Sequence, residues 1–277
     1  MSGTPKNLPP DRDLAPTIQK LRFRYAKRGR LRFSSHRDFQ RALERALRRA
    51  NIPMAYSAGF SPHPKISYTN SAPTGVASEA EYVEIGVTQI CDPQQVRAEL
   101  DAALPPGLDI IEVVPAMGSD FANRLEASLW RAEIEADLVE VQSAVSALMA
   151  AEEVMVERLT KAGKRVFDAR GAIISLTIDS DDSIDPTVDP VVDLQVDMGA
   201  EESDAPESTG CVILNMVVRH TTPSVRPDDV LTALKQVGGL VPRKPVRVTR
   251  LAQGPLNPLE EVNCPIGDPF DPDRVLA

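Results

Sequence analysis

The sequence predicts an α+β protein with two units, each running in the order strand, helix, strand, strand, helix, strand. Two observations lead to this prediction. In some segments apolar residues occur at every second position, which is the period of a strand. These segments alternate along the chain with others in which apolar residues recur every three or four positions, which is the period of a helix. This succession occurs between residues 20 and 117 and again, more loosely, between residues 125 and 255.

The first predicted strand has two unlike faces. Apolar side chains alternate with arginine, in the order Leu21, Arg22, Phe23, Arg24, Tyr25. Because successive side chains of a strand point to opposite faces, one face is apolar and the other is basic. The alternation resumes at residues 30–33, which indicates a hairpin or a bulged strand, with Arg30 and Arg32 on its polar face.

A helix follows, with one apolar stripe and one basic face. The stripe has the spacing of a buried helix face and consists of Phe39, Ala42, Leu43, Ala46, Leu47 and Ala50. Ser35 is a favourable N-cap with Asp38 three positions later, and residues 51–53 end the helix. The outer surface carries Arg37, Arg41, Arg45, Arg48 and Arg49.

The rest of the first unit follows from turn and cap signals. A loop with the sequence "YSAGFSPHPKIS" precedes the alternating strand "EYVEIGV". Asp92 and Pro93 are an N-cap and a first helical residue, and "LDIIEVV" is a closing strand. This succession is the split βαβ, or ferredoxin-like, arrangement, so we expect two tandem ferredoxin-like units with antiparallel sheets.

The second unit repeats that order around an acidic insertion. We expect a strand at 129–136, a helix at 138–153, a strand pair turned at 161–164, a strand at 211–220, a helix opened by Pro227 and a strand at 245–251. Residues 179–210 hold eleven Asp and Glu and no Lys or Arg, which predicts an exposed, partly disordered insertion in which "VVDLQVDM" is a possible strand. Residues 1–19 and 256–277 are expected to be disordered tails.

The charges are unevenly distributed along the chain. The net charge is −9, yet residues 20–65 contain thirteen Lys and Arg against Asp38 and Glu44. Such a basic segment in an acidic chain is typical of a surface that attracts a polyanion. No apolar run approaches the roughly 20 residues of a membrane span, and the N-terminus has no signal core, so a cytoplasmic protein is expected.

The arginine helix is the main candidate for a binding site. A solvated face is the ordinary explanation of a charged helix, but such faces usually mix both signs. We predict that it binds nucleic-acid phosphates and prefer RNA, because no helix-turn-helix, zinc finger or basic zipper is present. The predicted contacts are Arg30, Arg32, Arg37, Arg41, Arg45, Arg48, Arg49, His63 and Lys65, which Arg22 and Arg24 would extend. Aromatic residues nearby are few (Tyr25, Tyr56, Phe60 and Tyr68), so sequence-specific reading of single strands is not predicted.

The loop "GFSPHPKIS" is the second candidate. Pro62 and Pro64 restrict the backbone on both sides of His63, which would hold His63 and Lys65 in place for a ligand. A purely structural turn explains the same residues equally well.

Catalytic and metal-binding residues have weaker signals. His36 and Asp38, with His63, are possible metal ligands or acid–base residues, and Lys65 is a further catalytic candidate, but Asp38 is better explained as a capping residue. The metal-ligand interpretation is the weaker one, so no metal site is predicted, and Cys91, Cys211 and Cys264 are too far apart for a cysteine cage. Asp168 and Arg170 share a strand face as an ion pair or a functional pair, and His220 resembles a surface histidine. With no nucleotide loop, nucleophile elbow or H-E-x-x-H motif, an enzyme is not favoured.

The run from "LRFRYAKRGRLRFSSHRDFQRALERALRRANIP" through "AYSAGFSPHPKIS" to "ASEAEYVEI" resembles radical-SAM-linked proteins, a bacterial domain of unknown function. The segments "KRVFDAR" and "RPDDVLTAL" extend the resemblance over most of Lys20 to Leu251. It implies a domain fused to, or encoded beside, a radical S-adenosylmethionine protein. This chain lacks the C-x-x-x-C-x-x-C motif, so no cofactor is expected in it, and S-adenosylmethionine and an iron-sulfur cluster would belong to a partner.

Three hypotheses follow. The first is an RNA-binding accessory factor that works with a separate radical SAM or RNA-modifying enzyme. The second is an enzyme that acts on RNA through His36, Asp38, His63 and Lys65, and the third is a protein-interaction module without nucleic acid. The sequence predicts no oligomeric state and no reaction.

Overall fold

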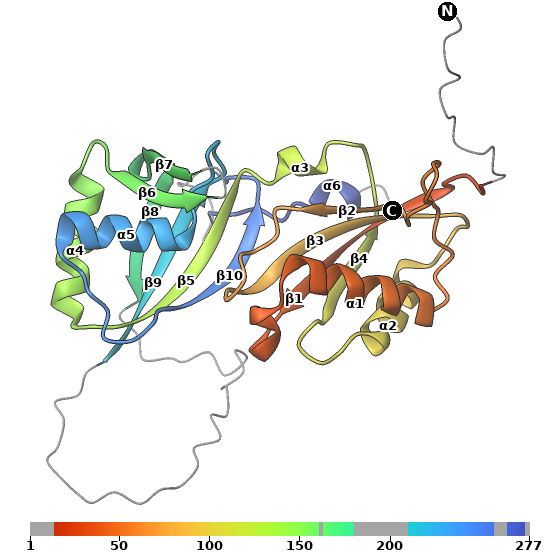
Figure 1. Ribbon diagram of the computed structural model, residues 1–277, viewed down its shortest axis with the longest axis horizontal. Coiled ribbons are helices and arrows are strands. Elements are labelled where there is room, and N and C mark those ends of the chain that lie inside the picture. The colour runs from red at the N-terminus through yellow and green to blue at the C-terminus, as the bar shows by residue number, and fades with distance from the viewer. Residues whose placement is uncertain (1–13, 161–162, 180–209, 258–264, 275–277) are drawn as a thin grey trace, which may run out of the picture. The chain divides into compact units, whose positions relative to one another are not determined.

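The computed structural model describes residues 14–160, 163–179, 210–257 and 265–274, and the chain divides into two compact units (Figure 1). Unit 1 comprises residues up to 75, residues 79–122 and the C-terminal segment from residue 270. Unit 2 comprises residues 76–78 and 123–269. Both are mixed α/β, with mostly antiparallel strands.

The strands of unit 1 lie in the order β4-β1-β3, and β2 pairs with β3. β4 is antiparallel to β1, and β2 is antiparallel to β3. The elements are β1 (Gln19–Lys27), the 3-10 helix η1 (Gly29–Phe33), α1 (His36–Arg49), β2 (Ile66–Thr69), β3 (Ala77–Val87), α2 (Pro93–Ala103), β4 (Ile110–Pro115), α3 (Phe121–Arg124) and α6 (Asp271–Arg274).

The core of unit 1 lies between one sheet face and the helices α1 and α2 (Figure 1). The predicted apolar stripe of α1 is confirmed, because Phe39, Leu43 and Leu47 are buried against the sheet. Opposite them, Phe23 of β1 is fully buried. Each such side chain contributes about 1.5–3 kcal/mol by leaving water, which is why α1 presents its arginines outward.

The second run of alternating residues is not a strand. Residues 29–33 form η1, none of whose residues is buried. Gly29 has a φ of 52°, a left-handed conformation that glycine adopts without strain. The chain therefore turns out of the sheet at Gly29, and the strand that precedes β3 is β2, which the sequence did not single out.

The arginine face of β1 lies against the C-terminal segment. Arg22 is fully buried, and its guanidinium contacts Asp273 of α6. Arg24 pairs with Glu112 of β4, with Nη2 3.6 Å from Oε2. The prediction that Arg22 and Arg24 extend the basic face of α1 is therefore wrong, because they lie on the sheet face opposite α1.

The two predicted tails are partly ordered. β1 begins at Gln19, and residues 265–274 include α6, where Phe270 and Asp273 are fully buried. The prediction of a disordered segment is wrong for residues 265–274. The prediction relied on the proline-rich composition of the segment, whereas the buried side chains of Phe270 and Asp273 hold it against unit 1. Residues 1–13, 258–264 and 275–277, and 180–209 of the acidic insertion, lie outside the described residues.

The strands of unit 2 lie in the order β10-β5-β9-β8, with every neighbouring pair antiparallel. A separate antiparallel pair, β6 and β7, follows α4. The elements are β5 (Ala127–Glu135), α4 (Leu138–Ala150), β6 (Met155–Thr160), β7 (Gly163–Asp168), η2 (Arg170–Ala172), β8 (Ile173–Asp179), β9 (Cys211–Arg219), α5 (Pro227–Gly238) and β10 (Arg247–Gly254).

Helices α4 and α5 pack against each other in unit 2 (Figure 1). Their approach is so close at Gly238 that a side chain there would collide with the backbone of Ala144. Among the helices that the structure describes, none has both the length and the apolar character needed to cross a membrane.

Candidate nucleic-acid interface

The N-terminus of α1 is closed by a reciprocal capping box. The Ser35 hydroxyl accepts a hydrogen bond from the backbone N–H of Asp38 at 3.2 Å, and the Asp38 carboxylate accepts from the backbone N–H of Ser35 at 3.2 Å. The hydrogen bonds from the Ser35 side chain and backbone lower the pKa of Asp38. The role of Asp38 as a capping residue is thereby confirmed.

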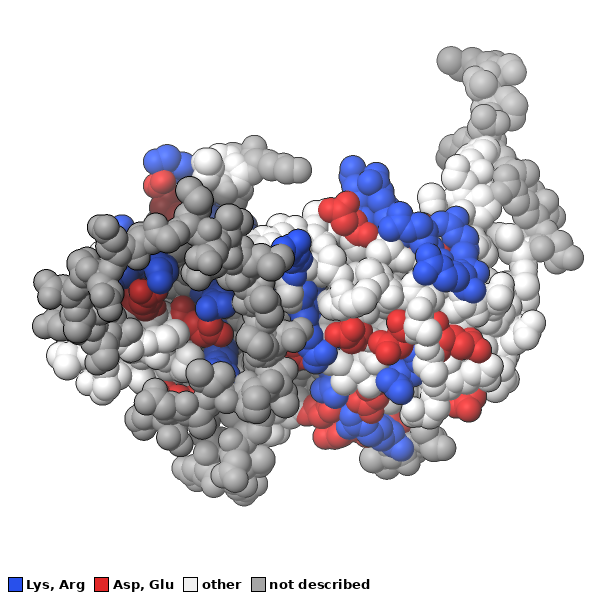
Figure 2. Space-filling model, turned by 90° about the horizontal axis from the view of Figure 1, so that it is seen from below, with Lys and Arg blue, Asp and Glu red and all other residues white. Residues whose placement is uncertain are grey.

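The outer face of α1 carries a row of exposed arginines, here called the arginine row: Arg37, Arg41, Arg45, Arg48 and Arg49. Arg37, Arg41 and Arg45 make no hydrogen bond or ion pair with any residue that the structure describes. Among the residues that the structure describes, Arg48 and Arg49 donate to the backbone carbonyls of Glu44 and Ala103, each at 3.2 Å, and to no side chain. Figure 2 shows a group of Lys and Arg side chains on the unit that contains α1.

Several arginines elsewhere in the chain have acidic partners. Arg28 pairs with Glu79 and with Asp109, and Arg274 pairs with Glu112. In unit 2, Arg158 pairs with Asp229. The arginines of the row differ from these residues because they form no ion pair with a described carboxylate, although the charges of Arg41 and Arg37 help to lower the pKa of Asp38. Five arginines against Asp38 and Glu44 leave an excess of positive charge on α1 that is available to an external anion.

The remaining predicted basic contacts lie on η1 and in the loop before β2. Arg30 is exposed, whereas the Arg32 Nε donates to the Gly75 carbonyl at 2.7 Å. Lys65 is exposed, and its Nζ donates to the Thr17 hydroxyl at 3.0 Å.

The loop that carries His63 is held closed by its own backbone. The N–H of Ser57 donates to the His63 carbonyl at 2.8 Å, and the Ser57 hydroxyl accepts from the His63 N–H at 3.1 Å. The N–H of Lys65 donates to the Ala55 carbonyl at 2.8 Å. The backbone at His63 therefore has a structural role, while its side chain is exposed and available to a ligand.

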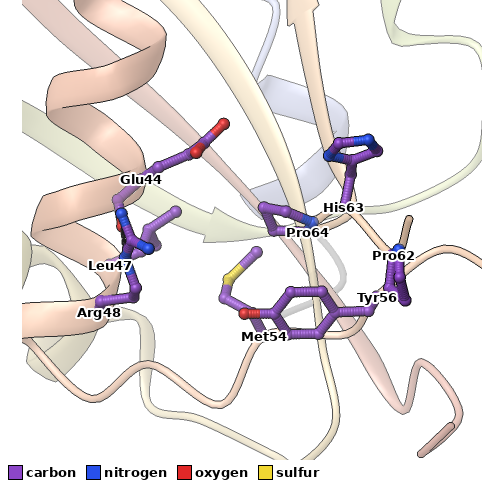
Figure 3. Close-up of a pocket in the computed structure, with 8 residues that line it drawn as sticks. All are labelled: Glu44, Leu47, Arg48, Met54, Tyr56, Pro62, His63 and Pro64. Carbon is purple, nitrogen blue, oxygen red and sulfur yellow. Dashed lines mark hydrogen bonds between the residues drawn. The ribbon is translucent and has the colours of Figure 1, made fainter.

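A pocket of about 210 Å³ lies between this loop and α1 (Figure 3). It is lined by Glu44, Leu47 and Arg48 of α1 and by Met54, Tyr56, Pro62, His63 and Pro64 of the following segment. The arginine row and the His63 loop, which the sequence singled out separately, thus meet at one pocket.

His36 and Asp38 are not among the residues that line this pocket. The Nε2 of His36 lies 3.0 Å from the Gln40 amide nitrogen and its Nδ1 lies 3.1 Å from the Ser71 hydroxyl. Because the Gln40 amide donates, Nε2 accepts and the proton is assigned to Nδ1, which donates to Ser71. No cluster of three or more His, Cys, Asp or Glu side chains suited to a metal ion occurs in the described part of the chain.

Sequence reasoning assigned no site role to two residues of this region, since it treated Glu44 only as a charge and Tyr68 only as a nearby aromatic residue. The Glu44 carboxylate lines the pocket, and its signal in the sequence is that it interrupts a series of arginines. The Tyr68 hydroxyl is buried and has no hydrogen-bond partner among the described residues. Burial and the charge of Glu44 raise the pKa of Tyr68 well above its usual value.

The candidates in unit 2 have structural roles. Asp168 accepts backbone N–H bonds from Val154 and Gly171, among others, at 2.9 and 2.8 Å. His220 is mostly buried between the Leu125 carbonyl, 2.6 Å from Nδ1, and the Ser128 hydroxyl, 2.7 Å from Nε2. The prediction that His220 is an ordinary surface histidine is therefore wrong.

Comparison with known proteins bears on the family of the chain. No curated protein matches the sequence. A family model matches residues 20–227, which span β1, the arginine row, the His63 loop and most of unit 2 as far as the start of α5. The chain belongs to the bacterial family described as "uncharacterized protein conserved in bacteria (DUF2344)".

Proposed function

We propose that this protein is an RNA-binding accessory factor whose arginine row contacts phosphate groups. The observation that carries the proposal is the set of five exposed arginines on α1 that form no ion pair with a described carboxylate. Lys and Arg side chains that neutralise phosphates release condensed counterions, so each contact adds affinity that salt removes.

The stability of α1 accounts for Arg48 and Arg49, which lie in its last turn, but not for Arg37, Arg41 and Arg45. Arg37 and Arg41 stand four positions apart, as do Arg41 and Arg45, so like charges are neighbours on the helix surface. Such pairs destabilise a helix by about 0.2–0.5 kcal/mol each. A negatively charged binding partner would offset the repulsion between these arginines, which accounts for their presence on α1.

The fold is compatible with this proposal. We propose that both units are ferredoxin-like, because their strand orders, β4-β1-β3-β2 and β10-β5-β9-β8, are equivalent. The same fold occurs in proteins of unrelated function, so the proposal rests on the arginine row rather than on the fold.

We further propose that a separate enzyme supplies the chemistry. The resemblance to radical-SAM-linked proteins suggests a radical SAM protein as that partner, which would hold S-adenosylmethionine and the cluster. An enzyme built from His36, Asp38, His63 and Lys65 is less favoured, because Asp38 caps α1 and Lys65 is bonded to Thr17.

Fluorescence anisotropy with a structured RNA and with single-stranded RNA tests the proposal. The Arg41→Glu, Arg45→Glu double variant should lose binding, because two contacts become repulsive. Arg165→Glu with Arg219→Glu is the matched control, since both arginines are exposed in unit 2 and the charge change is the same. Equal binding by the wild type and the Arg41, Arg45 variant would exclude α1 as the RNA surface and favour the protein-interaction hypothesis.

A further inference from the structure

A carboxylate stands within the arginine row, where it opposes the approach of phosphate. Glu44 lies one turn from both Arg41 and Arg48 on α1. Its side chain makes no hydrogen bond or ion pair with any residue in the described part of the chain. An unpaired carboxylate on a cationic face is unfavourable for binding a polyanion unless it accepts hydrogen bonds from that ligand.

The pocket beside Glu44 combines apolar walls with polar groups. Figure 3 shows the Glu44 carboxylate directed toward the side of the pocket formed by His63 and Pro64. Tyr56, a residue that is 39% exposed, and the Met54 thioether lie on the loop side of the pocket. Aromatic rings of this kind are the platforms on which unstacked RNA bases lie.

We infer that this pocket binds a guanine base of single-stranded RNA, with Glu44 accepting hydrogen bonds from N1–H and the 2-amino group of the base. Tyr56 provides the stacking surface, and Arg48, which lines the same pocket, contacts a flanking phosphate. This inference rests on the proposed RNA-binding function and names the base that the site selects.

The choice of guanine follows from the chemistry of a carboxylate. An ionised carboxylate only accepts hydrogen bonds, and its two oxygens match two adjacent donors. Among the four RNA bases, only guanine presents two adjacent donors on its Watson–Crick edge. Adenine and cytosine each place an acceptor beside their amino group, and uracil places acceptors on both sides of its single donor, so each would bring an acceptor against Glu44.

The test uses uridine oligomers with one central guanosine, inosine or adenosine, and an all-uridine oligomer, measured by fluorescence anisotropy. The wild type should bind the guanosine oligomer about tenfold more tightly than the adenosine oligomer. Inosine, which lacks the 2-amino donor, should bind less tightly than guanosine.

Glu44→Gln separates base recognition from general electrostatics. This variant should lose the guanosine preference while binding the all-uridine oligomer at least as tightly as the wild type, because a negative charge has left the cationic face. Glu140→Gln, the same change at an exposed helical position of unit 2, should alter neither.

Two results would overturn the inference while leaving RNA binding intact. One is equal affinity of the wild type for all four oligomers, and the other is a guanosine preference that persists in Glu44→Gln. Failure of the wild type to bind any RNA, structured or single-stranded, would instead refute the proposed function, and the inference would fail with it.

Discussion

Arg22 and Asp273 are separated by 251 positions in the sequence and form a buried ion pair in unit 1. The Arg22 Nη1 lies 2.9 Å from both oxygens of the Asp273 carboxylate, and the exposed fractions of the two side chains are 1% and 0%. Arg22 also donates to the carbonyls of Met117 and Gly118 and to the Glu84 carboxylate. All three nitrogens of its guanidinium group therefore form hydrogen bonds. The C-terminal segment is thereby part of unit 1.

Loss of the Asp273 carboxylate should destabilise unit 1. Asp273→Ala leaves the Arg22 guanidinium buried without its carboxylate partner. Removal of one partner of a buried ion pair lowers the free energy of unfolding by about 3–5 kcal/mol. Urea denaturation followed by circular dichroism measures the loss, and faster hydrogen exchange in β1 and α6 locates it. Asp271→Ala is the control because the Asp271 side chain is 69% exposed. Equal unfolding midpoints for the two variants would contradict the importance of the buried pair.

The salt dependence of RNA binding should report the number of arginines that contact phosphate. For single strands the slope of log affinity against log salt changes by about 0.7 for each contact. Arg41→Ala and Arg45→Ala together should therefore reduce the slope by about 1.4, twice that value. Titrations at several salt concentrations measure it, and an unchanged slope would mean that these two residues do not contact phosphate.

Tyr56 should contribute stacking energy to RNA binding. Tyr56→Ala should weaken binding of the guanosine oligomer by about 1–3 kcal/mol, the usual value for removing one stacked base contact. Tyr56→Phe retains the ring and should bind nearly as the wild type does. The comparison is made by anisotropy, and equal losses in the two variants would point to the hydroxyl rather than the ring.

Stability should depend on pH through His220. Burial lowers the pKa of His220 below its ordinary value of 6.5, the Leu125 carbonyl acts in the opposite direction, and the charge of Arg250 lowers it further. The unfolded chain therefore binds a proton at a higher pH than the folded chain does. The stability associated with neutral His220 is present above pH 6.5 and is lost as the pH falls below it.

Thermal unfolding at pH 7.5 and pH 5.5 tests this prediction. The midpoint of the wild type should fall more between these two conditions than that of His220→Gln, which cannot titrate. His63→Gln is the control, because His63 is exposed. A fall of the same size in wild type and His220→Gln would assign the pH dependence to other groups.

The local pattern of the sequence was sufficient to predict α1 and its cap. The spacing from Phe39 to Ala50 indicates a helix with one buried face, and Ser35 and Asp38 mark its start, because both signals depend on residues within a few positions of each other. The same reasoning failed at residues 29–33, where Gly29 turns the chain and alternation alone does not make a strand.

By itself, the sequence determined the period of β1, the amphipathic character of α1 and the concentration of arginine on its outer face, since these are properties of neighbouring residues. Only the tertiary structure decided which arginines are accessible. It buries Arg22 under a segment from the other end of the chain and leaves Arg41 exposed, although both belong to the same basic stretch. It also brings the His63 loop to Glu44, because contacts between segments distant in the chain depend on how the sheet and helices pack.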